Sequence, residues 1–390
     1  MKIGIDARFY GPVGKGLGRY TQKLIENLEK ISAQGEPVLG GKNEYFIFLK
    51  KENFEEYIPQ NKNFKKILAN YRWYSLSEQL LFPKLLRKYN LDLMHFPHFN
   101  VPIFYGRKFV VTVHDLILIH FPTTKNSTLN PFFYKIKFLA YRFIISFALK
   151  YSKKIITVSN FTKDDILANY KKIKSNKIKV TYEACDDFCM LSPDKDKEII
   201  EKYGIIKPYI IYIGNAYPHK NLERLVGAFK ELKKTQKALS LVLVGKKDYF
   251  HIRLEKLVNE RKIKDVVFSD YVPDYHLDIL QHNASAYVFP SLYEGFGLPP
   301  LEAMAKGVPV VSSDHPCMRE ILGKSAYFFD GKDEKSIAKA IEKVLTNDEL
   351  RANLIRDGYQ QIRKYNWKKM AQETLQIYEN SLKVNNVSKK

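Results

Sequence analysis

Short apolar runs alternate with longer segments of helical periodicity along most of the chain. In the first half, KIGIDA (2–7) predicts a strand, and YTQKLIENLEKI (20–31) predicts the helix that follows it. The further predicted strands are YFIFLK, LDLMHF, VVTVHD and KIITVS, with helices near SLSEQLLFPKLLRKY and over 131–151. Buried parallel strands that alternate with crossover helices are typical of doubly wound sheets, so we predict an α/β fold.

A second series of the same kind occupies the other half of the chain. Its predicted strands are YIIYIGN, LSLVLVGK, VVFSDYV, AYVFPS and PVVSS. A polar segment around SPDKDKE separates the two series. We predict an N-terminal Rossmann-like domain over 1–188, a linker over 189–206, a C-terminal Rossmann-like domain over 207–366 and a final helix over 367–390. Two such domains facing each other would form a cleft at the carboxyl ends of their strands, where open α/β sheets bind ligands.

The formal net charge is +22, and the first half of the chain carries most of the excess. Residues 1–190 hold 31 Lys+Arg against 16 Asp+Glu, whereas residues 191–390 hold 33 against 26. Two interpretations stay open: lysine-rich solvated faces, or an anionic partner such as a membrane surface or a nucleotide. We find no helix-turn-helix pattern, zinc finger or aromatic RNA-binding signature, so a nucleic-acid partner is not predicted.

The apolar stretch PFFYKIKFLAYRFIISFALKYSKKIITV (131–158) is interrupted by lysine and arginine too often for a spanning helix. It predicts either a half-buried helix that leads into a strand or a basic amphipathic helix on an anionic leaflet. The start, MKIGIDARFY, has no apolar signal core, and the three cysteines have no zinc spacing. We therefore expect a cytoplasmic protein, with peripheral binding to the inner face of the membrane as an option.

The stretch SLYEGFGLPPLEAMAKGVPVVSS (291–313) places two carboxylates around a loop rich in glycine and proline. Pro299 and Pro300 suit the start of a helix after a predicted strand. Backbone N–H groups there would form a donor surface for an anion or for sugar hydroxyls, which glycines let approach closely. Glu302, in the first turn of that helix, could accept from both ribose hydroxyls, and Glu294 from a hexose hydroxyl. Alternatively, Glu302 complements the helix dipole and Glu294 is solvated.

This stretch resembles the two-glutamate signature of retaining nucleotide-sugar glycosyltransferases of family GT4, which have the GT-B fold. The resemblance covers nearly the whole chain through GLGRYTQKL, LMHFPHFNVP, VVTVHDL, IITVSNFTKDDI, YIGNAYPHKNLERL, LVLVGK and FSDYVPDYHLDIL. EGFGLPPLEAMAKGVPVV is the most specific piece, and the order and spacing of the others support it. The resemblance implies two Rossmann-like domains facing across a cleft and no bound metal or other cofactor.

By this resemblance, Glu302 binds the ribose of the donor, while Glu294 and the backbone after it hold the donor sugar and diphosphate. Lys220, in PHKN, neutralises the diphosphate, whose negative charge grows as the glycosidic bond breaks. A lysine at a helix start is electrostatically poor unless an anion is near. The predicted donor-binding residues are Gly16, Gly18, Asn215, Lys220, Glu294, Gly295, Phe296, Gly297, Leu298 and Glu302.

Asn215 departs from the family pattern, because many members have an arginine at this position. The second diphosphate cation is therefore missing or comes from elsewhere. Arg19 and Lys15, in the glycine stretch GPVGKGLGRY, are the candidates to replace it, and Arg19 is also predicted on the acceptor side. Gly16 and Gly18 would let the backbone approach the donor phosphate or the acceptor, although glycine turns after strands are common.

Three histidines lie at or near the ends of predicted strands. His114 follows VVTV beside Asp115, and the resemblance implies contact with the donor sugar or positioning of the acceptor. The alternative is a satisfied histidine in a packed turn. His95 and His98, in MHFPHF, either line the acceptor side or pack in the core. With Glu294 and Lys220, His114 completes the predicted catalytic set.

The resemblance predicts transfer of a hexose from a nucleoside diphosphate sugar to a hydroxyl of a glycan or lipid-linked acceptor, with retention at the anomeric carbon. No residue is a convincing covalent nucleophile, and the resemblance implies front-face attack, in which the leaving phosphate takes the acceptor proton. SLSEQLLFP, HFPHFNVP and PHKN are most similar to members that use GDP-mannose or related hexoses for surface polysaccharide, and by the same logic the acceptor would be a lipid-linked or lipopolysaccharide glycan. The alternatives are another GT-B enzyme, such as a sugar-nucleotide epimerase, and a non-catalytic protein that binds nucleotide sugars or membranes.

Overall fold

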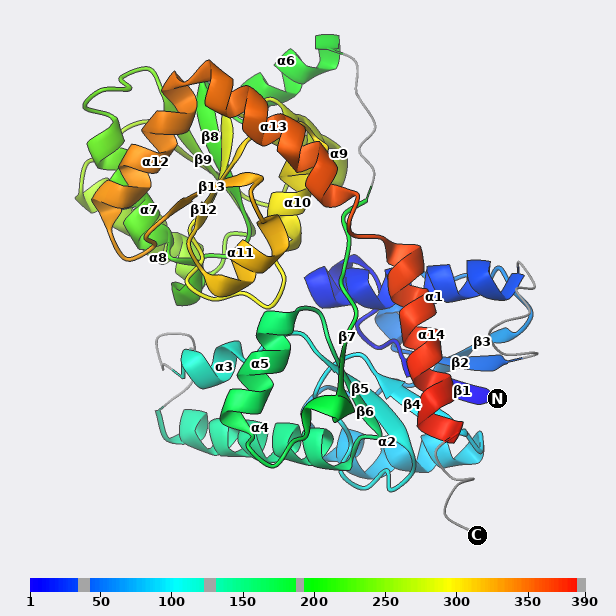
Figure 1. Cartoon of the computed structure of the whole chain (residues 1–390). Helices are drawn as coiled ribbons and strands as arrows, with labels where there is room; N and C mark the ends of the chain where they lie inside the picture. Colours follow the sequence, from blue (N-terminus) through cyan, green and yellow to red (C-terminus); the bar gives the residue numbers. More distant parts are fainter. Residues whose placement is uncertain (34–42, 123–130, 187–192, 384–390) are drawn as a thin grey trace. The chain divides into compact units, whose positions relative to one another are not determined.

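The computed structural model describes residues 1–33, 43–122, 131–186 and 193–383 (Figure 1). The chain forms two compact units. Unit 1 takes its described residues from Met1 to Glu183 and from Asn366 onward, and unit 2 runs from Ala184 to Tyr365. In the described part, no helix combines the length and the apolar character needed to cross a membrane.

Unit 1 is built on a seven-stranded parallel sheet with the strand order β3-β2-β1-β4-β5-β6-β7. Its strands are β1 (Lys2–Asp6), β2 (Glu44–Leu49), β3 (Phe64–Leu68), β4 (Leu93–Phe96), β5 (Phe109–Val113), β6 (Lys154–Thr157) and β7 (Ile178–Val180). Its helices are η1 (Pro12–Gly14), α1 (Lys15–Ala33), η2 (Lys51–Asn53), α2 (Leu76–Lys88), α3 (Ile117–His120), α4 (Pro131–Tyr151), α5 (Asn160–Asn169), η4 (Ser175–Lys177) and α14 (Trp367–Lys383).

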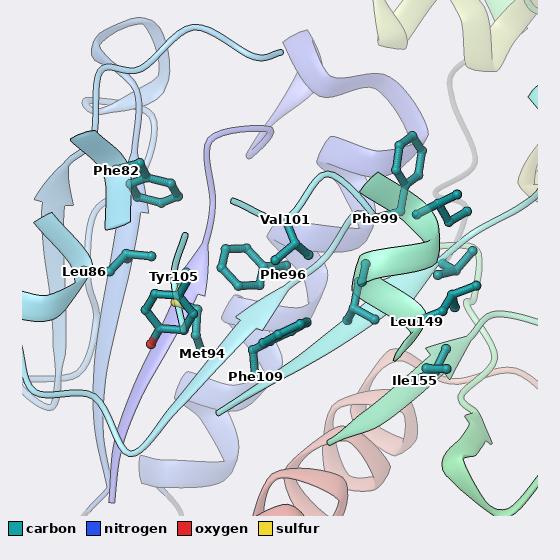
Figure 2. Packing of buried hydrophobic residues seen from close by; sticks show 14 of the residues in the cluster. Phe82, Leu86, Met94, Phe96, Phe99, Val101, Tyr105, Phe109, Leu149 and Ile155 are labelled. Atoms are coloured by element: carbon teal, nitrogen blue, oxygen red, sulfur yellow. The ribbon is translucent and has the colours of Figure 1, made fainter. Parts of the chain in front are cut away.

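The central strands of unit 1 are buried on both faces, as their continuous apolar runs predict. On one face, side chains of the strands meet those of α2 and α4 in a single cluster, of which Figure 2 shows Phe82, Leu86, Phe96, Phe109 and Leu149. On the other face, α14 packs against α1, so the last helix of the chain completes the unit that the first helix begins.

Unit 2 has a six-stranded parallel sheet with the order β10-β9-β8-β11-β12-β13. Its strands are β8 (Tyr209–Ile213), β9 (Ser240–Val244), β10 (Val266–Ser269), β11 (Ala286–Phe289), β12 (Val310–Ser313) and β13 (Ala326–Phe329). Its helices are α6 (Pro193–Lys202), η5 (Pro218–Lys220), α7 (Leu222–Leu232), α8 (Tyr249–Glu260), α9 (Asp274–His282), α10 (Leu298–Ala305), α11 (Pro316–Leu322), α12 (Glu334–Thr346) and α13 (Asp348–Ile362).

Both sheets confirm the predicted doubly wound α/β class. Counted within each unit, the first six strands have the order 3-2-1-4-5-6 of the Rossmann fold, which reverses direction beside the first strand, and β7 adds a seventh strand to unit 1. The sequence predicts a linker over 189–206. The described residues of this segment instead include α6, which packs on α9 within unit 2. All the predicted site residues except His95, which lies within β4, are in segments that follow the carboxyl ends of β1, β4, β5, β8 and β11.

Candidate active site

Lys220 and Glu294 form an ion pair in unit 2. Lys220 ends η5, and Glu294 lies in the loop between β11 and α10. The distance from Lys220 Nζ to Glu294 Oε1 is 2.6 Å, and the two side chains are 17% and 10% exposed. Burial alone would raise the pKa of Glu294, but the charge of Lys220 and its hydrogen bond hold that pKa below its ordinary value. The structure thus joins two of the three predicted catalytic residues in a charged, partly open pair.

Asn221 fixes the two loops that carry this pair. Its backbone has a left-handed φ of 63°, and its side-chain amide donates to the carbonyls of Pro290 at 3.1 Å and Gly331 at 2.7 Å. The N–H of Leu292 also donates to the carbonyl of His219 at 2.7 Å. Sequence reasoning gave Asn221 no role, although it belongs to the PHKN motif. The amide ties η5 to the end of β11 and thereby positions Lys220 against Glu294.

The glycine loop after Glu294 is closely packed, with Gly295 and Phe296 buried and Gly297 partly exposed. Phe296 is buried, and its ring packs edge-on against Tyr365 with centroids 5.5 Å apart. Gly297 has a φ of 92°, and a Cβ there would lie 2.8 Å from Met318 Cε. The positive φ favours glycine at this position, whereas the Met318 methyl ends a flexible side chain that can shift. The role of the loop's backbone N–H groups as a donor surface stays a prediction.

Glu302 is the fifth residue of α10, because the helix begins at Leu298. The prediction that Glu302 lies in the first turn is wrong, since that turn contains no acidic residue. The explanation of Glu302 as a complement to the helix dipole weakens accordingly, because the dipole acts mainly within the first turn. Burial sets the pKa of Tyr287 well above its ordinary value, and nearby Tyr212, Glu302 and Glu294 raise it further.

Asn215 lies in the loop after β8. Its carbonyl accepts a hydrogen bond from the Tyr212 hydroxyl at 2.9 Å, and its side-chain oxygen accepts from the N–H of Tyr217 at 3.5 Å. The Asn215 side chain thus forms a hydrogen bond within its own loop, and it cannot supply the positive charge of an arginine. The role of Asn215 toward a donor stays a prediction.

The glycine stretch of unit 1 is more helical than expected. Gly16 and Gly18 lie in the first turn of α1, which begins at Lys15, rather than in a loop. A Cβ on Gly18 would lie 2.1 Å from the carbonyl oxygen of Gly11, so Gly18 lets the helix start pack on the preceding loop. Gly16 faces open space. Arg19 is partly buried in the same helix, and the side chain of Lys15 lies outside the described part.

His114, directly after β5, is held at both ring nitrogens. Nδ1 lies 3.1 Å from Glu183 Oε1, and Nε2 lies 2.9 Å from the Pro97 carbonyl oxygen. Both partners are acceptors, so the arrangement suits the protonated, charged imidazole. Burial would lower the pKa of His114, but Glu183 and Pro97 raise it above its ordinary value. The geometry favours a satisfied histidine, and sequence reasoning missed Glu183, which lies 69 residues away.

His95 is fully enclosed, and the structure favours the packing interpretation over the acceptor side for this residue. Its ring bonds the Tyr378 hydroxyl at 2.6 Å and the Thr112 hydroxyl at 2.8 Å. Burial lowers the pKa of His95 to about 3, so the ring is neutral. His95 has no exposed surface with which to contact an acceptor.

His98 is less enclosed. It accepts from the N–H of Asn100 at 3.2 Å and packs beside Phe9 and Phe99. Burial, together with nearby positive charge, lowers the pKa of His98 to about 3. A place on the acceptor side stays a prediction for His98 and Arg19.

A buried charge network in unit 1 was not foreseen. Arg8 Nη2 lies 2.7 Å from Asp6 Oδ2 and 2.8 Å from Glu78 Oε1, and the side chain of Arg8 is fully buried. Asn100 donates to both oxygens of Glu78 at 2.8 and 2.9 Å. The guanidinium also stacks 3.8 Å from the centre of the Trp73 ring. The motif IDAR shows charges at the end of a strand. No local sequence pattern indicates that Glu78 and Asn100, 70 and 92 residues after Arg8, complete the network.

Within the described residues, no group of three or more His, Cys, Asp or Glu side chains is placed to hold a metal ion. Metal independence stays a prediction.

The sequence matches two family models along most of its length. Residues 42–187 match Glycosyltransferase Family 4, and residues 195–361 match Glycosyl transferases group 1. The O-antigen chain mannosyltransferase RfbU of Salmonella typhimurium is 30% identical over 86% of this chain and 88% of its own. The O-antigen chain mannosyltransferase B of Escherichia coli is 30% identical over 93% of this chain and 95% of its own.

Solved structures share the fold. Sucrose-phosphate synthase from Thermosynechococcus elongatus has a TM-score of 0.75 at 18% identity and covers 97% of this chain and 98% of its own. Anabaena HepE, solved in complex with UDP-glucose, has a TM-score of 0.71 at 15% identity and covers 97% of this chain and 100% of its own. The two Rossmann-like units, the paired glutamates around a glycine loop and these matches agree: the chain belongs to the family 4, group 1 glycosyltransferases.

Proposed function

We propose that this glycosyltransferase moves a hexose, with mannose favoured, from a nucleoside diphosphate sugar to a hydroxyl of a glycan or lipid-linked acceptor in surface polysaccharide synthesis. The observation that carries the proposal is the Lys220–Glu294 pair, 2.6 Å apart at the start of the glycine loop. The named activities of the two full-length relatives, both O-antigen chain mannosyltransferases, support the hexose and the pathway class.

In the proposed reaction, the bond between the anomeric carbon and the diphosphate oxygen breaks while a bond to the acceptor oxygen forms. The acceptor proton passes to the leaving phosphate, so atoms and charge balance without a covalent enzyme intermediate. Lys220 stabilises the negative charge that grows on the diphosphate, because a fixed cation acts more strongly on the transition state than on the ground state. Retention at the anomeric carbon is part of the proposal and follows from attack on the face that the diphosphate leaves.

Glu302 and Glu294 take separate roles in this proposal. Glu302 accepts from the two ribose hydroxyls, and Glu294 holds the sugar and orients Lys220. Because Glu294 already neutralises part of the Lys220 charge, a bound diphosphate competes for the same ammonium. Donor binding therefore rearranges a pair that exists before the ligand arrives.

A binding and transfer experiment tests this function. Thermal unfolding of the whole chain is followed with GDP, UDP, ADP, dTDP and their common sugars, since a ligand that binds only the folded state raises the midpoint. We expect one nucleotide family to do so. Glu302→Gln should weaken the binding of that nucleotide by about 10- to 100-fold, which corresponds to the loss of hydrogen bonds to a charged group. Glu349→Gln, at an exposed position of α13, should change nothing.

Transfer is then measured with the nucleotide sugar so identified and a glycan acceptor. Turnover that needs the acceptor, keeps the anomeric configuration and persists with EDTA would support the proposal. Unchanged transfer by Glu302→Gln would remove the ribose assignment. Conversion of the nucleotide sugar without any acceptor would replace the transferase with an epimerase.

A further inference from the structure

Helix α4 turns large apolar side chains outward as well as inward. Its inner side, including Tyr141 and Leu149, belongs to the core cluster of unit 1. On its outer side, Leu139 is 64% exposed and Phe143 60% exposed, and Ile136 is also exposed. Positions 136, 139 and 143 follow the three- and four-residue spacing of one helix face. The outer apolar stripe is therefore continuous and separate from the buried one.

The charges on α4 all have one sign. The helix carries four basic residues and no acidic residue; the basic ones are Lys135, Lys137, Arg142 and Lys150. All four are exposed, and in the described part of the chain none forms an ion pair with a carboxylate. On the helix surface, Lys135 and Arg142 lie beside Leu139, at spacings of four and three residues. The outer stripe is thus apolar at its centre and positive at its margin.

Helix α2 repeats this composition. Leu76, 80% exposed, and Leu80 and Leu81 point outward, together with Lys84 and other basic residues of the last turns. The single acidic residue of α2 is Glu78, which is fully buried against Arg8.

Both helices cover the same face of the seven-stranded sheet. Phe82 and Leu86 of α2 and Leu149 of α4 enter one cluster, which Figure 2 shows beside the strands. We call the outer surface of these two helices the α2–α4 face. It combines exposed leucine, isoleucine and phenylalanine with unpaired positive charge, over two elements of one unit.

The chemistry of this face fits an anionic lipid surface. Lys and Arg near a bilayer are attracted by acidic headgroups, and their long stems allow neighbouring apolar side chains to enter the interface. An acidic protein partner would meet the charge but not the exposed leucines, and a second copy would bring like charges together. The lysine cluster of unit 2 around Lys237 and Lys264 lacks the combination, because no exposed leucine or phenylalanine lies among its residues.

We propose that the α2–α4 face docks the protein on an anionic bilayer, with its basic side chains on headgroup phosphates and Leu139 and Phe143 in the interfacial layer. This inference deepens the proposed function and rests on it for one point, that a lipid-linked acceptor is presented at such a surface. Docking itself requires neither donor nor acceptor.

The test is co-sedimentation of the whole purified chain with vesicles of phosphatidylcholine, with and without phosphatidylglycerol. We expect binding only to the anionic vesicles and release at high salt. Leu139→Glu/Phe143→Glu should lower the partition coefficient by about tenfold or more, because it replaces interfacial side chains by negative charge. Since both positions are exposed, the thermal midpoint should stay unchanged.

Two control variants separate a docking face from general attraction. Ile206→Glu/Ile252→Glu adds the same charges at residues of unit 2 that are 68% and 52% exposed, and it should keep vesicle binding. Lys237→Glu/Lys264→Glu reverses charges of the unit 2 lysine cluster and should have a much smaller effect than the α4 variant. Equal losses in all three variants would overturn the localised face in favour of overall charge.

Other outcomes are also decisive. The proposal is overturned if the unaltered protein does not bind anionic vesicles, or if the α4 variant binds them fully. It is also overturned if the unaltered protein self-associates without binding vesicles and the α4 variant abolishes that self-association. The α4 variant should keep the nucleotide-induced thermal shift. If the unaltered protein shows the nucleotide-induced shift but does not bind vesicles, only the docking proposal fails. If it binds vesicles but shows no nucleotide-induced shift, only the proposed transferase function fails.

Discussion

In unit 1, Arg8 is enclosed between Asp6 and Glu78, and none of the three side chains reaches solvent to a significant extent. In unit 2, Lys220 has a single carboxylate partner, and both side chains keep some exposure beside the glycine loop. The first arrangement satisfies its charges inside the protein, which leaves none for a ligand. The second leaves a cation that an incoming anion can reach. The distances between opposite charges are similar in the two units. The Arg8 network differs from the Lys220–Glu294 pair in its deeper burial and its complete set of hydrogen bonds.

The largest effect is expected from Arg8→Met. This change leaves Asp6 and Glu78 buried without their common cation, which costs about 3–5 kcal/mol of unfolding free energy. Urea unfolding followed by tryptophan fluorescence measures it, because both tryptophans, Trp73 and Trp367, belong to unit 1. Lys65→Met is the control, since Lys65 and Glu44 form an exposed pair at 2.6 Å in the same sheet. If the two variants unfold at the same urea concentration, burial does not distinguish the networks.

The second effect concerns activity. Lys220→Met should lower kcat by about 10²–10³-fold, the usual cost of removing one group that stabilises transition-state charge. It should also destabilise unit 2, because Glu294 loses its partner, and Glu294→Gln added to it should restore part of that stability without restoring transfer. Lys339→Met, at an exposed position of α12, is the control for a lost lysine. Recovery of transfer in the double variant would show that Lys220 only balances Glu294.

The smallest effect is a pH dependence in unit 1. The pKa of His114 is raised in the folded protein, so its protonation stabilises the fold below the unfolded pKa of about 6.5, and this stability is lost as pH rises through the folded pKa. Glu183→Gln should therefore destabilise unit 1 more at about pH 6 than at about pH 9. Urea unfolding at both pH values measures the difference. In a His114→Gln background, Glu183→Gln should show no such dependence, and a persisting one would assign the titration to another group.

The sheets could be predicted because their central strands are continuous apolar runs, as in YIIYI and SLVLV. The strands that sequence analysis did not identify, β3, β7 and β13, all lie at sheet edges. FKKIL of β3 is half exposed and contains two lysines, so it lacks the pattern of a strand covered on both faces. For β3, charged side chains on an edge strand thus weaken the sequence signal.

The unit 2 pair could be predicted because its residues lie in short motifs whose backbone places them at strand ends. His95 could not be assigned in this way. It lies in a strand that is buried throughout, and its partner Tyr378 comes from a helix 283 residues later. Arg8 is a similar case, since its environment is set by residues of α2 and of the segment after β4. Contacts across the chain decide whether a polar side chain at a strand end is satisfied or available.

The bond between His95 and Tyr378 also has a consequence for synthesis of the protein on the ribosome. The described residues of unit 2 form one stretch of sequence, which can fold while the chain is still growing, whereas β4 of unit 1 waits for α14. At about 5–20 residues per second, the 283 residues between the two partners take roughly 15–60 s to translate. During that interval one face of the first sheet is without its last helix. Unit 1, whose first strands are made before unit 2, is therefore completed only after unit 2 has been synthesised.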